Sequence, residues 1–498
     1  MHEARARLRR EGFAGAETTN FESPMLTIES WVGHSYFQRE SMNSILRFGL
    51  LLLLVATAVA QNPTPSPTPP LLKPDERLKV DVLLIVAHPD DETGVVPYLV
   101  QLIDEHKHVA VVYTTHGEAG HNNMGPERAQ SLGAVREMEL RHALARVGID
   151  NVWFLSGRDT PSQNVLQSLA NWRQGEVEEE LVRMVRLTRP EVIITWMPGF
   201  FVGENHGDHQ AAGVLATEAF DSAGDPTVFP AQVAGPVKVN ETLLDGLQPW
   251  QAKKLYYFPD SGDDIFKGVG PTYQTNGMSK ALKIPYWRAG FETFKYHLTQ
   301  YRNFIEGLKK MDEKQVAEQE KNWGGEGSFV FGKSLVPGSV TGDVFEGITP
   351  GQIAFVPPAR EAYPQPRGLA VELGGPWGFY EKFLHAHGIT KLPQAKEPEI
   401  AIKRGATLLL PLELHHHTDA AKTMTIAVKL PEGWTTESGV GSLSLDPQSD
   451  YYWQVMLDAS KADVKERQEI ECTATADGKT VATIKISVRL VNGGLPQN

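Results

Sequence analysis

The chain has 498 residues, more than one ordinary domain needs, so two or three domains are expected. Hydrophobic residues make up 41% of the sequence, which is enough to bury a core and excludes a largely disordered chain. The formal net charge is −13 and no cluster of Lys and Arg is present, which argues against a nucleic-acid partner, because phosphate backbones are bound by clustered basic residues.

The N-terminal part contains the pattern of a signal peptide. A short basic segment, Met42–Arg47, precedes the apolar run Phe48–Ala56 and an A-x-A end at Ala58–Ala60. This pattern predicts a signal peptide over 42–60, cleaved after Ala60, and hence a secreted or periplasmic protein. The alternative is an uncleaved anchor, but the run is short for crossing a bilayer, so no stable membrane insertion is expected after cleavage. Residues 1–41 lack apolar periodicity, and we interpret them as a non-native extension upstream of a start at Met42.

A Pro/Thr/Ser-rich linker at 61–75 leads into a domain predicted over 76–260. Apolar runs predict strands at Val80–Ala87, Val109–Thr115, Val152–Leu155 and Val192–Met197. Helices are expected between and after them, at Glu127–Val147, Glu176–Thr188 and Gln210–Phe220. This alternation predicts an α/β fold with a doubly wound, Rossmann-like, mostly parallel sheet.

Two of the predicted strands are followed by clusters of His and Asp. The first strand runs into His88-Pro89-Asp90-Asp91-Glu92, and the fourth is followed by Asn205-His206-Gly207-Asp208-His209. Ligands collect beyond the carboxyl ends of such strands, so the two clusters are expected to converge at one edge of the sheet. So much charge beside a buried strand requires a cation or a chemical task. The structural alternative is that Asp90 caps the following helix.

Together these motifs resemble the LmbE-like, or PIG-L, family of zinc-dependent N-acetylglucosamine deacetylases. The resemblance extends from Leu78 to Phe258, with a weaker element near His297. It is carried by A-H-P-D-D-E at Ala87–Glu92, H-x-D-H at His206–His209, the turn Thr115–Gly120, the R-x-x-E-L helix motif at Arg136–Leu140 and the late strand Lys254–Phe258.

The resemblance implies a role for each matching residue. It implies one Zn²⁺ per chain, or another divalent metal, with His88, Asp91 and His209 as ligands. It further implies Asp90 as general base and His206 as the electrophilic partner, and Arg136 and Asp159 as substrate-binding residues that contact the sugar. His297 and Gln300 resemble a looser H-x-S-Q element, in which this chain has Thr299 instead of Ser.

The chemistry of these residue types agrees with this interpretation. Two imidazoles and one carboxylate form a three-ligand zinc site with an open position, at which a water molecule ionises near about pH 7. Asp90 can transfer that proton to the leaving amine, while a protonated His206 stabilises the oxyanion. The same ligand set occurs in non-haem Fe(II) oxygenases, which is the alternative metal assignment; those enzymes usually have all-β folds.

Residues 261–396 are interpreted as a continuation or insertion of uncertain structure, with one helix at Phe291–Lys310 and mostly loop with short strands at Asn322–Gly351. Several tryptophans are candidates to line a sugar site, although burial in the core is the more usual role of such large rings. These are Trp172, Trp196, Trp287 and Trp323.

Residues 397–498 are predicted to form a separate all-β domain, an Ig-like sandwich, from six strand-like runs separated by turns. The L-P-E-G-W phrase at Leu430–Trp434 resembles NEW3-type Ig-like modules of secreted carbohydrate enzymes. In the run His415-His416-His417, alternation in a strand would place only His415 and His417 on one face. A solvated loop end is favoured there over a metal tract. The single cysteine, Cys472, excludes an intramolecular disulfide.

The sequence therefore predicts an exported zinc amidohydrolase that removes the acetyl group from an N-acetylglucosamine-type sugar or glycoconjugate. One alternative keeps the chemistry and changes the substrate to another N-acyl or amide bond. The other is a non-catalytic protein that binds a carbohydrate or surface and has kept a metal site. Asp90 argues against this last alternative, because no ligand role requires it.

Overall fold

The structure is a computed structural model, and it describes residues 73–160, 164–199, 206–234, 238–239, 242–243, 246–259, 268–322, 324–389, 400–403, 405–462 and 467–491. The segment 1–41, the predicted signal peptide at 42–60 and most of the linker at 61–75 lie outside the described residues. Among the residues described, none of the helices has both the length and the hydrophobicity needed to cross a membrane.

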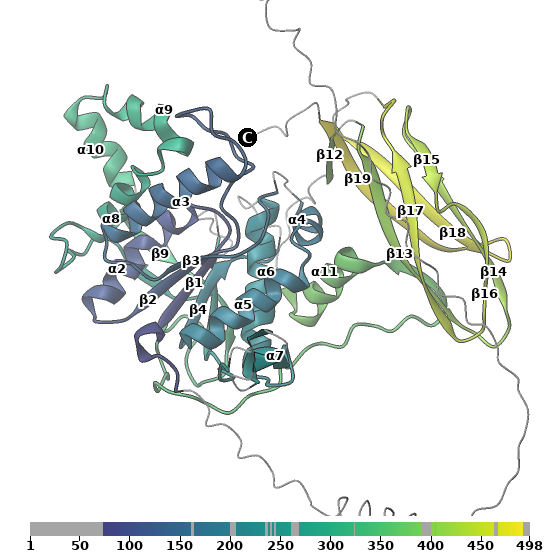
Figure 1. The fold of residues 1–498 in the computed structure, drawn as a ribbon, viewed down its shortest axis with the longest axis horizontal. Coiled ribbons are helices and arrows are strands. Elements are labelled where there is room, and N and C mark those ends of the chain that lie inside the picture. The colour runs from purple at the N-terminus through teal and green to yellow at the C-terminus, as the bar shows by residue number, and fades with distance from the viewer. Residues whose placement is uncertain are drawn as a thin grey trace, which may run out of the picture. The chain divides into compact units, whose positions relative to one another are not determined.

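A six-stranded sheet in the order β10-β7-β4-β1-β2-β3 organises the α/β part. Figure 1 labels its strands β4, β1, β2 and β3. Its five parallel strands are β1 (Val82–Val86), β2 (Val109–Tyr113), β3 (Val152–Phe154), β4 (Val192–Trp196) and β7 (Lys254–Phe258). Every residue of β1, β2, β4 and β7 is buried, as expected for parallel strands that helices cover on both faces. The predicted α/β, mostly parallel sheet is thus confirmed.

Two groups of helices flank the sheet (Figure 1). One group is formed by α2 (Val96–Asp104), α3 (Gln130–Ala145) and α8 (Tyr286–Phe294), and the other by α4 (Val165–Asn171), α5 (Gly175–Thr188) and α6 (Gly207–Ser222). The chain runs outward from β1 to β3 and then returns to add β4 on the other side of β1. The strand order therefore reverses between β1 and β4, where α/β sheets bind their ligands.

The part after residue 260 differs from the sequence-based expectation in one helix. The helix expected at Phe291–Lys310 is divided into α8 and α9 (Leu298–Leu308), because His297 has a non-helical backbone and a fully buried side chain. The short strands expected within Asn322–Gly351 include β10 (Val330–Ser334), which pairs antiparallel with β7. A strand from beyond residue 260 therefore forms one edge of the central sheet. The remaining short elements are η1 (Glu76–Leu78), η2 (Asp91–Gly94), α7 (Pro230–Val233), β5 (Lys238–Val239), β6 (Thr242–Leu243), β8 (Thr272–Gln274), α10 (Glu313–Asn322), β9 (Glu326–Ser328) and α11 (Gly375–Ala386).

The C-terminal part contains two further sheets, β11-β13-β17-β15 and β12-β19-β18-β14-β16. Apolar side chains from both sheets form one core, to which β13 contributes alternate residues such as Leu410, Leu412 and Leu414. One strand of this β-module, β11, precedes residue 397 and pairs antiparallel with β13. The Ig-like, NEW3-type assignment stays a prediction. The strands are β11 (Gly368–Leu373), β12 (Ile400–Lys403), β13 (Thr407–His417), β14 (Lys422–Lys429), β15 (Thr435–Ser438), β16 (Gly441–Leu445), β17 (Ser449–Asp458), β18 (Gln468–Ala476) and β19 (Lys479–Val491).

Candidate active site

The two His/Asp clusters meet at the reversal point of the sheet. β1 and β4 are adjacent and parallel, so the residues that follow them emerge side by side. The ring centroid of His88 lies 4.6 Å from that of His206 and 5.1 Å from that of His209. One nitrogen of each of these three imidazoles lies within 4.8 Å of the others, so the group could hold a metal ion.

Asp91 is anchored through one carboxylate oxygen and presents the other to the imidazoles. Its Oδ2 accepts hydrogen bonds from the backbone N–H groups of Ala87 (2.8 Å) and His88 (2.9 Å) and from Nε1 of Trp196 (2.7 Å). Its Oδ1 lies 3.1 Å from Nε2 of His209 and 3.6 Å from Nδ1 of His88. Burial opposes the charged form, but His209 and then His88 lower the pKa of Asp91 well below its ordinary value.

The separations from Asp91 Oδ1 to the two histidines can be compared with those of a zinc site. Ligand atoms about 2.0–2.1 Å from a tetrahedral zinc ion lie about 3.3 Å from one another. The distances from Asp91 Oδ1, 3.1 Å to His209 and 3.6 Å to His88, lie on either side of that value. The group whose donor atoms all lie within 4.8 Å of one another is His88, His206 and His209, so the ligand set His88, Asp91 and His209 stays a prediction.

The other nitrogen of His88 faces two carboxylates. His88 Nε2 lies 3.3 Å from Oδ1 of Asp159 and 3.3 Å from Oδ2 of Asp208. Burial lowers the pKa of His88, but the charge of Asp159 and the hydrogen bonds that the ring donates to the carboxylates outweigh it and raise the pKa well above its usual value. Carboxylates in such positions orient metal-binding imidazoles. No role was predicted for Asp208 from the sequence, although its place between His206 and His209 was a usable signal.

Asp90 lies in a strained backbone conformation and does not cap the helix that follows. Its φ is 119°, in the left-handed region that is costly for a residue other than glycine, and its side chain makes no capping hydrogen bond to η2. Instead, Oδ2 accepts hydrogen bonds from the hydroxyl of Tyr301 (2.7 Å) and from Nε2 of Gln300. Burial, followed by the charge of Asp91, raises the pKa of Asp90 to about 6. These contacts argue against the capping alternative.

The segment around α9 is tied to the first cluster. His297 Nε2 lies 2.9 Å from Oε1 of the fully buried Glu92, and Tyr113 donates to Oε2 of the same carboxylate (2.9 Å). The hydroxyl of Thr299 donates to Glu139 of the R-x-x-E-L motif (2.7 Å). The looser H-x-S-Q element thus lies beside the predicted site. The contact of Tyr301 with Asp90 was not predicted, because the only sequence signal for Tyr301 is its adjacency to that element.

His206 caps the N-terminus of α6 with its own ring. Its Nδ1 accepts the backbone N–H of Asp208 (3.2 Å), so that nitrogen carries no proton and Nε2 carries the hydrogen. Burial, and then the charges of His88 and His209, lower the pKa of His206 well below its ordinary value. A protonated ring was expected here from the sequence, whereas the capping contact favours a neutral imidazole with its hydrogen on Nε2.

Arg136 and Asp159, the two predicted sugar contacts, are engaged with other protein groups. Arg136 is only 5% exposed and donates from Nη1 to the carbonyl of Gly117 (2.6 Å) and from Nη2 to that of His121 (3.0 Å). A Cβ at Gly120 would lie 2.4 Å from Arg136 Nη2, which explains a glycine at that position. Arg136 therefore stabilises the Thr115–Gly120 turn, and Asp159 contacts His88. For both residues, contact with a sugar stays a prediction.

Two of the four tryptophans considered for a sugar site are core residues, the alternative that the sequence favoured. Trp172 is 2% and Trp196 4% exposed, which leaves neither ring a free face. Trp196 stacks on His209, with centroids 4.2 Å apart and an interplanar angle of 2°. A sugar-stacking role is therefore wrong for both. Trp287 is half-buried, and residue 323 lies outside the described residues.

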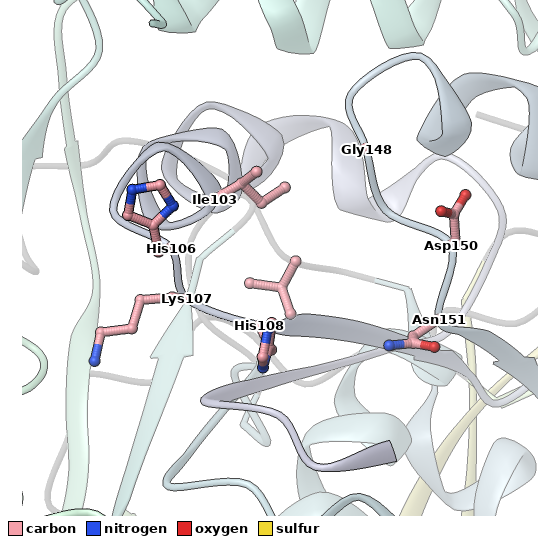
Figure 2. Close-up of a pocket in the computed structure, with 8 residues that line it drawn as sticks. Ile103, His106, Lys107, His108, Gly148, Asp150 and Asn151 are labelled. Atoms are coloured by element: carbon pink, nitrogen blue, oxygen red, sulfur yellow. The ribbon is translucent and has the colours of Figure 1, made fainter. Parts of the chain in front are cut away.

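A separate cavity of about 340 Å³ lies at the amino-terminal ends of the strands (Figure 2). Val109 begins β2 and Asn151 directly precedes β3, so the cavity lies at the other end of the sheet from the His/Asp clusters. It contains none of the predicted site residues. The lining residues are Ile103, His106, Lys107, His108, Val109, Gly148, Asp150 and Asn151.

Comparison with known proteins supports the family resemblance. Residues 83–220 match the sequence model of the family described as PIG-L: GlcNAc-PI de-N-acetylase. A 1D-myo-inositol 2-acetamido-2-deoxy-alpha-D-glucopyranoside deacetylase 1 of Frankia casuarinae is 33% identical over 196 residues, covering 35% of this chain and 57% of the relative. The corresponding deacetylase of Thermobifida fusca is 31% identical over 191 residues, covering 35% of this chain and 60% of the relative. The chain thus spans less than two thirds of the length of these two relatives.

Among solved structures, N,N'-diacetylchitobiose deacetylase from Pyrococcus horikoshii is similar, with 17% sequence identity and a TM-score of 0.35. The similarity covers 59% of this chain and 94% of that chain. The PIG-L resemblance is confirmed by the family match over residues 83–220, which include both His/Asp clusters.

Proposed function

We propose that the PIG-L family domain at residues 83–220 makes this chain a metal-dependent deacetylase that hydrolyses the N-acetyl amide of an N-acetylglucosamine-type sugar or glycoconjugate. The observation that carries the proposal is the convergence of His88, Asp91 and His209, with the carboxylate of Asp90 directly beside them in the sequence. The named relatives, which are deacetylases of 2-acetamido sugars, support the choice of substrate.

In this proposal, His88 Nδ1, Asp91 Oδ1 and His209 Nε2 hold one divalent ion, most suitably zinc. A bound zinc ion supplies Lewis acidity, which polarises a carbonyl group and makes water acidic near neutral pH. Asp159 and Asp208 orient His88 by contacting its other nitrogen, and Trp196 keeps Asp91 and His209 in place by its hydrogen bond and its stacked ring.

Asp90 is the general base and then the general acid. Its ionised carboxylate takes the proton from the attacking water and passes it to the amine nitrogen as the C–N bond breaks. Tyr301 and Gln300 are positioning residues, because both donate to Oδ2 and hold the carboxylate in one orientation. The strained backbone at Asp90 fits this role, since strain is commonly retained at functional sites.

His206 stabilises the oxyanion as a neutral donor. Its Nδ1 accepts the backbone N–H of Asp208, so in the neutral ring the hydrogen is on Nε2, which is the atom we assign as donor to the substrate oxygen. A preorganised donor of this kind contributes most where negative charge develops, as on the amide oxygen during attack by water.

The test is acetate release by the full chain from a panel of N-acetylated compounds. The panel contains N-acetylglucosaminyl-inositol, N,N'-diacetylchitobiose, N-acetylglucosamine and an N-acetyl amino acid, with Asp90→Asn as the catalytically impaired control. Activity on the sugars that depends on Asp90 and is lost on chelation supports the proposal. If only the N-acetyl amino acid is hydrolysed, the substrate is a different amide and not a sugar. If acetate release persists without metal, the reaction does not depend on a metal ion.

We also propose that the chain is exported through the segment 42–60, on the basis of its basic, apolar and A-x-A parts. N-terminal sequencing of the protein recovered outside the cytoplasm should find Gln61 as the first residue. Recovery of a protein that begins upstream of residue 42 would contradict this.

A further inference from the structure

A second cluster of imidazoles and carboxylates lies in the β-module. We call it the β13 cluster, and it consists of His415, His417 and Asp450 with Glu372 and Glu413 beside them. Nδ1 of His415 lies 2.8 Å and Nε2 of His417 lies 3.0 Å from the same oxygen, Oδ1 of Asp450. The cluster shares no residue with the proposed active site, yet it offers the same donor types, two imidazoles and one carboxylate.

Strand geometry builds this cluster. Alternate residues of a strand share a face, so His415 and His417 lie on the side of β13 away from the core residues Leu412 and Leu414. Asp450 of β17 pairs directly opposite His415 in the antiparallel register. The solvated loop end favoured by the sequence analysis is therefore wrong, because His415 is 8% exposed and His416 is fully buried on the core face.

The cluster carries more negative than positive charge. Glu372 and Glu413 face each other in the register of β11 and β13, and like charges in that arrangement are destabilising. Lys382 pairs with Glu413 at 3.2 Å. If the imidazoles are neutral, the described residues here carry three carboxylates, of Glu372, Glu413 and Asp450, and one ammonium group, of Lys382. A divalent cation, or protonation of both histidines, would balance the excess negative charge.

One nitrogen of the cluster is buried without a hydrogen-bond partner. Within the described part of the chain, Nε2 of His415 has no hydrogen bond, and Oε2 of Glu372 lies 3.7 Å away. An unpaired polar atom in a buried position is costly. If His415 binds a cation through Nδ1, its Nε2 carries the proton and points to Glu372, the arrangement that orients metal-binding imidazoles.

We propose that the β13 cluster binds a divalent transition-metal ion of the zinc type through His415 Nδ1, His417 Nε2 and Asp450 Oδ1. Two nitrogen donors favour zinc, nickel or copper over magnesium or calcium. The donor separations of 2.8 and 3.0 Å need only open by a few tenths of an ångström to reach the tetrahedral value of about 3.3 Å. His417 is 36% exposed, so the ion can enter from solvent, and once bound it links the end of β13 to β17.

The test compares zinc stoichiometry in the full chain and in variants, after removal of metal by a chelator and dialysis against Zn²⁺ at neutral pH. His417→Ala and Asp450→Asn should each bind one equivalent fewer than the unmodified chain, or bind it at least about tenfold more weakly. His142→Ala removes an exposed imidazole from α3 and should bind the same amount as the unmodified chain. The His417→Ala and Asp450→Asn variants should also lose any rise in melting temperature that zinc produces in the β-module.

The readout is the difference of one equivalent, so it does not depend on whether the His88 site binds metal. Equal zinc stoichiometry and affinity in the unmodified chain, His417→Ala and Asp450→Asn would overturn the proposal. Protonated histidines would then supply the balancing charge. Because His417 is partly exposed, its replacement by alanine is not expected to unfold the module. Unchanged acetate release and circular dichroism serve as the folding controls.

Discussion

The indole Nε1 of Trp196 donates a 2.7 Å hydrogen bond to Oδ2 of Asp91, across 105 residues of sequence. Trp196 is the last residue of β4 and Asp91 follows β1, so adjacent parallel strands bring the two together. The same indole stacks on His209. One core side chain therefore positions two of the three proposed metal ligands.

Trp196→Phe should weaken metal binding while leaving the fold intact. Phenylalanine keeps an aromatic ring against His209 but cannot donate to Asp91, and loss of such outer contacts typically costs about 10–100-fold in metal affinity or activity. Zinc competition with a chelating dye measures the change. Trp172→Phe is the matched control, because it removes another buried indole N–H, one that donates to Arg158 at 2.8 Å. An equal loss of affinity in both variants would show that Trp196 acts only through general packing.

Asp90→Asn and Asp91→Asn should affect different properties of the protein, turnover in the first and metal content in the second. Asp91→Asn replaces a charged donor with an amide and should lower metal content. Asp90→Asn should retain the metal and lose about 10²–10⁴-fold in turnover, the usual contribution of a positioned proton shuttle. Metal analysis, melting temperature and turnover on both proteins check this. Near-normal turnover in metal-replete Asp90→Asn would remove Asp90 from the mechanism.

Tyr301→Phe should move the acidic limb of the kcat/KM profile to higher pH. Burial raises the pKa of Asp90 to about 6, while the hydrogen bond from Tyr301 lowers it by stabilising the carboxylate. Removing the hydroxyl therefore raises the pKa further, and activity should fall more at pH 6 than at pH 8. Tyr452→Phe, which alters an 82% exposed residue in the β-module, should leave the profile unchanged. A uniform loss at all pH values would indicate a structural role for Tyr301 instead.

Glu178→Gln should change how stability depends on pH. Burial, followed by the charge of Glu218, raises the pKa of Glu178 from 4.5 to about 7. The folded chain thus binds this proton more tightly than the unfolded chain, so the stabilisation is complete below pH 4.5 and is lost as pH rises through about 7. Relative to the unmodified chain, the melting temperature of Glu178→Gln should rise between pH 5 and pH 8 by about 2–4 °C.

The control for that experiment is Glu176→Gln, on the exposed side of the same helix, where the side chain is 60% exposed. Its melting temperature should follow that of the unmodified chain at both pH values. If Glu178→Gln also follows the unmodified chain, Glu178 does not titrate differently in the folded and unfolded states.

The sequence alone determined the elements around the site and the identity of most of its side chains. Fully apolar runs such as Val192–Met197 predict buried parallel strands, because only strands covered on both faces are apolar at every position. The position of His88 and His209 after such runs then implied convergence at one edge. These inferences succeeded because they depend on local patterns and on a general rule of sheet topology.

Only the tertiary structure decided which partners orient those side chains. Tyr301 reaches Asp90 over 211 residues, Asp208 reaches His88 over 120, and Asp450 reaches His415 over 35. Contacts of this kind depend on how helices and strands pack, and no spacing in the sequence encodes them. For the same reason the recruitment of β10 and β11 into sheets was not foreseen, since an edge strand needs only one apolar face and its partner is chosen by packing.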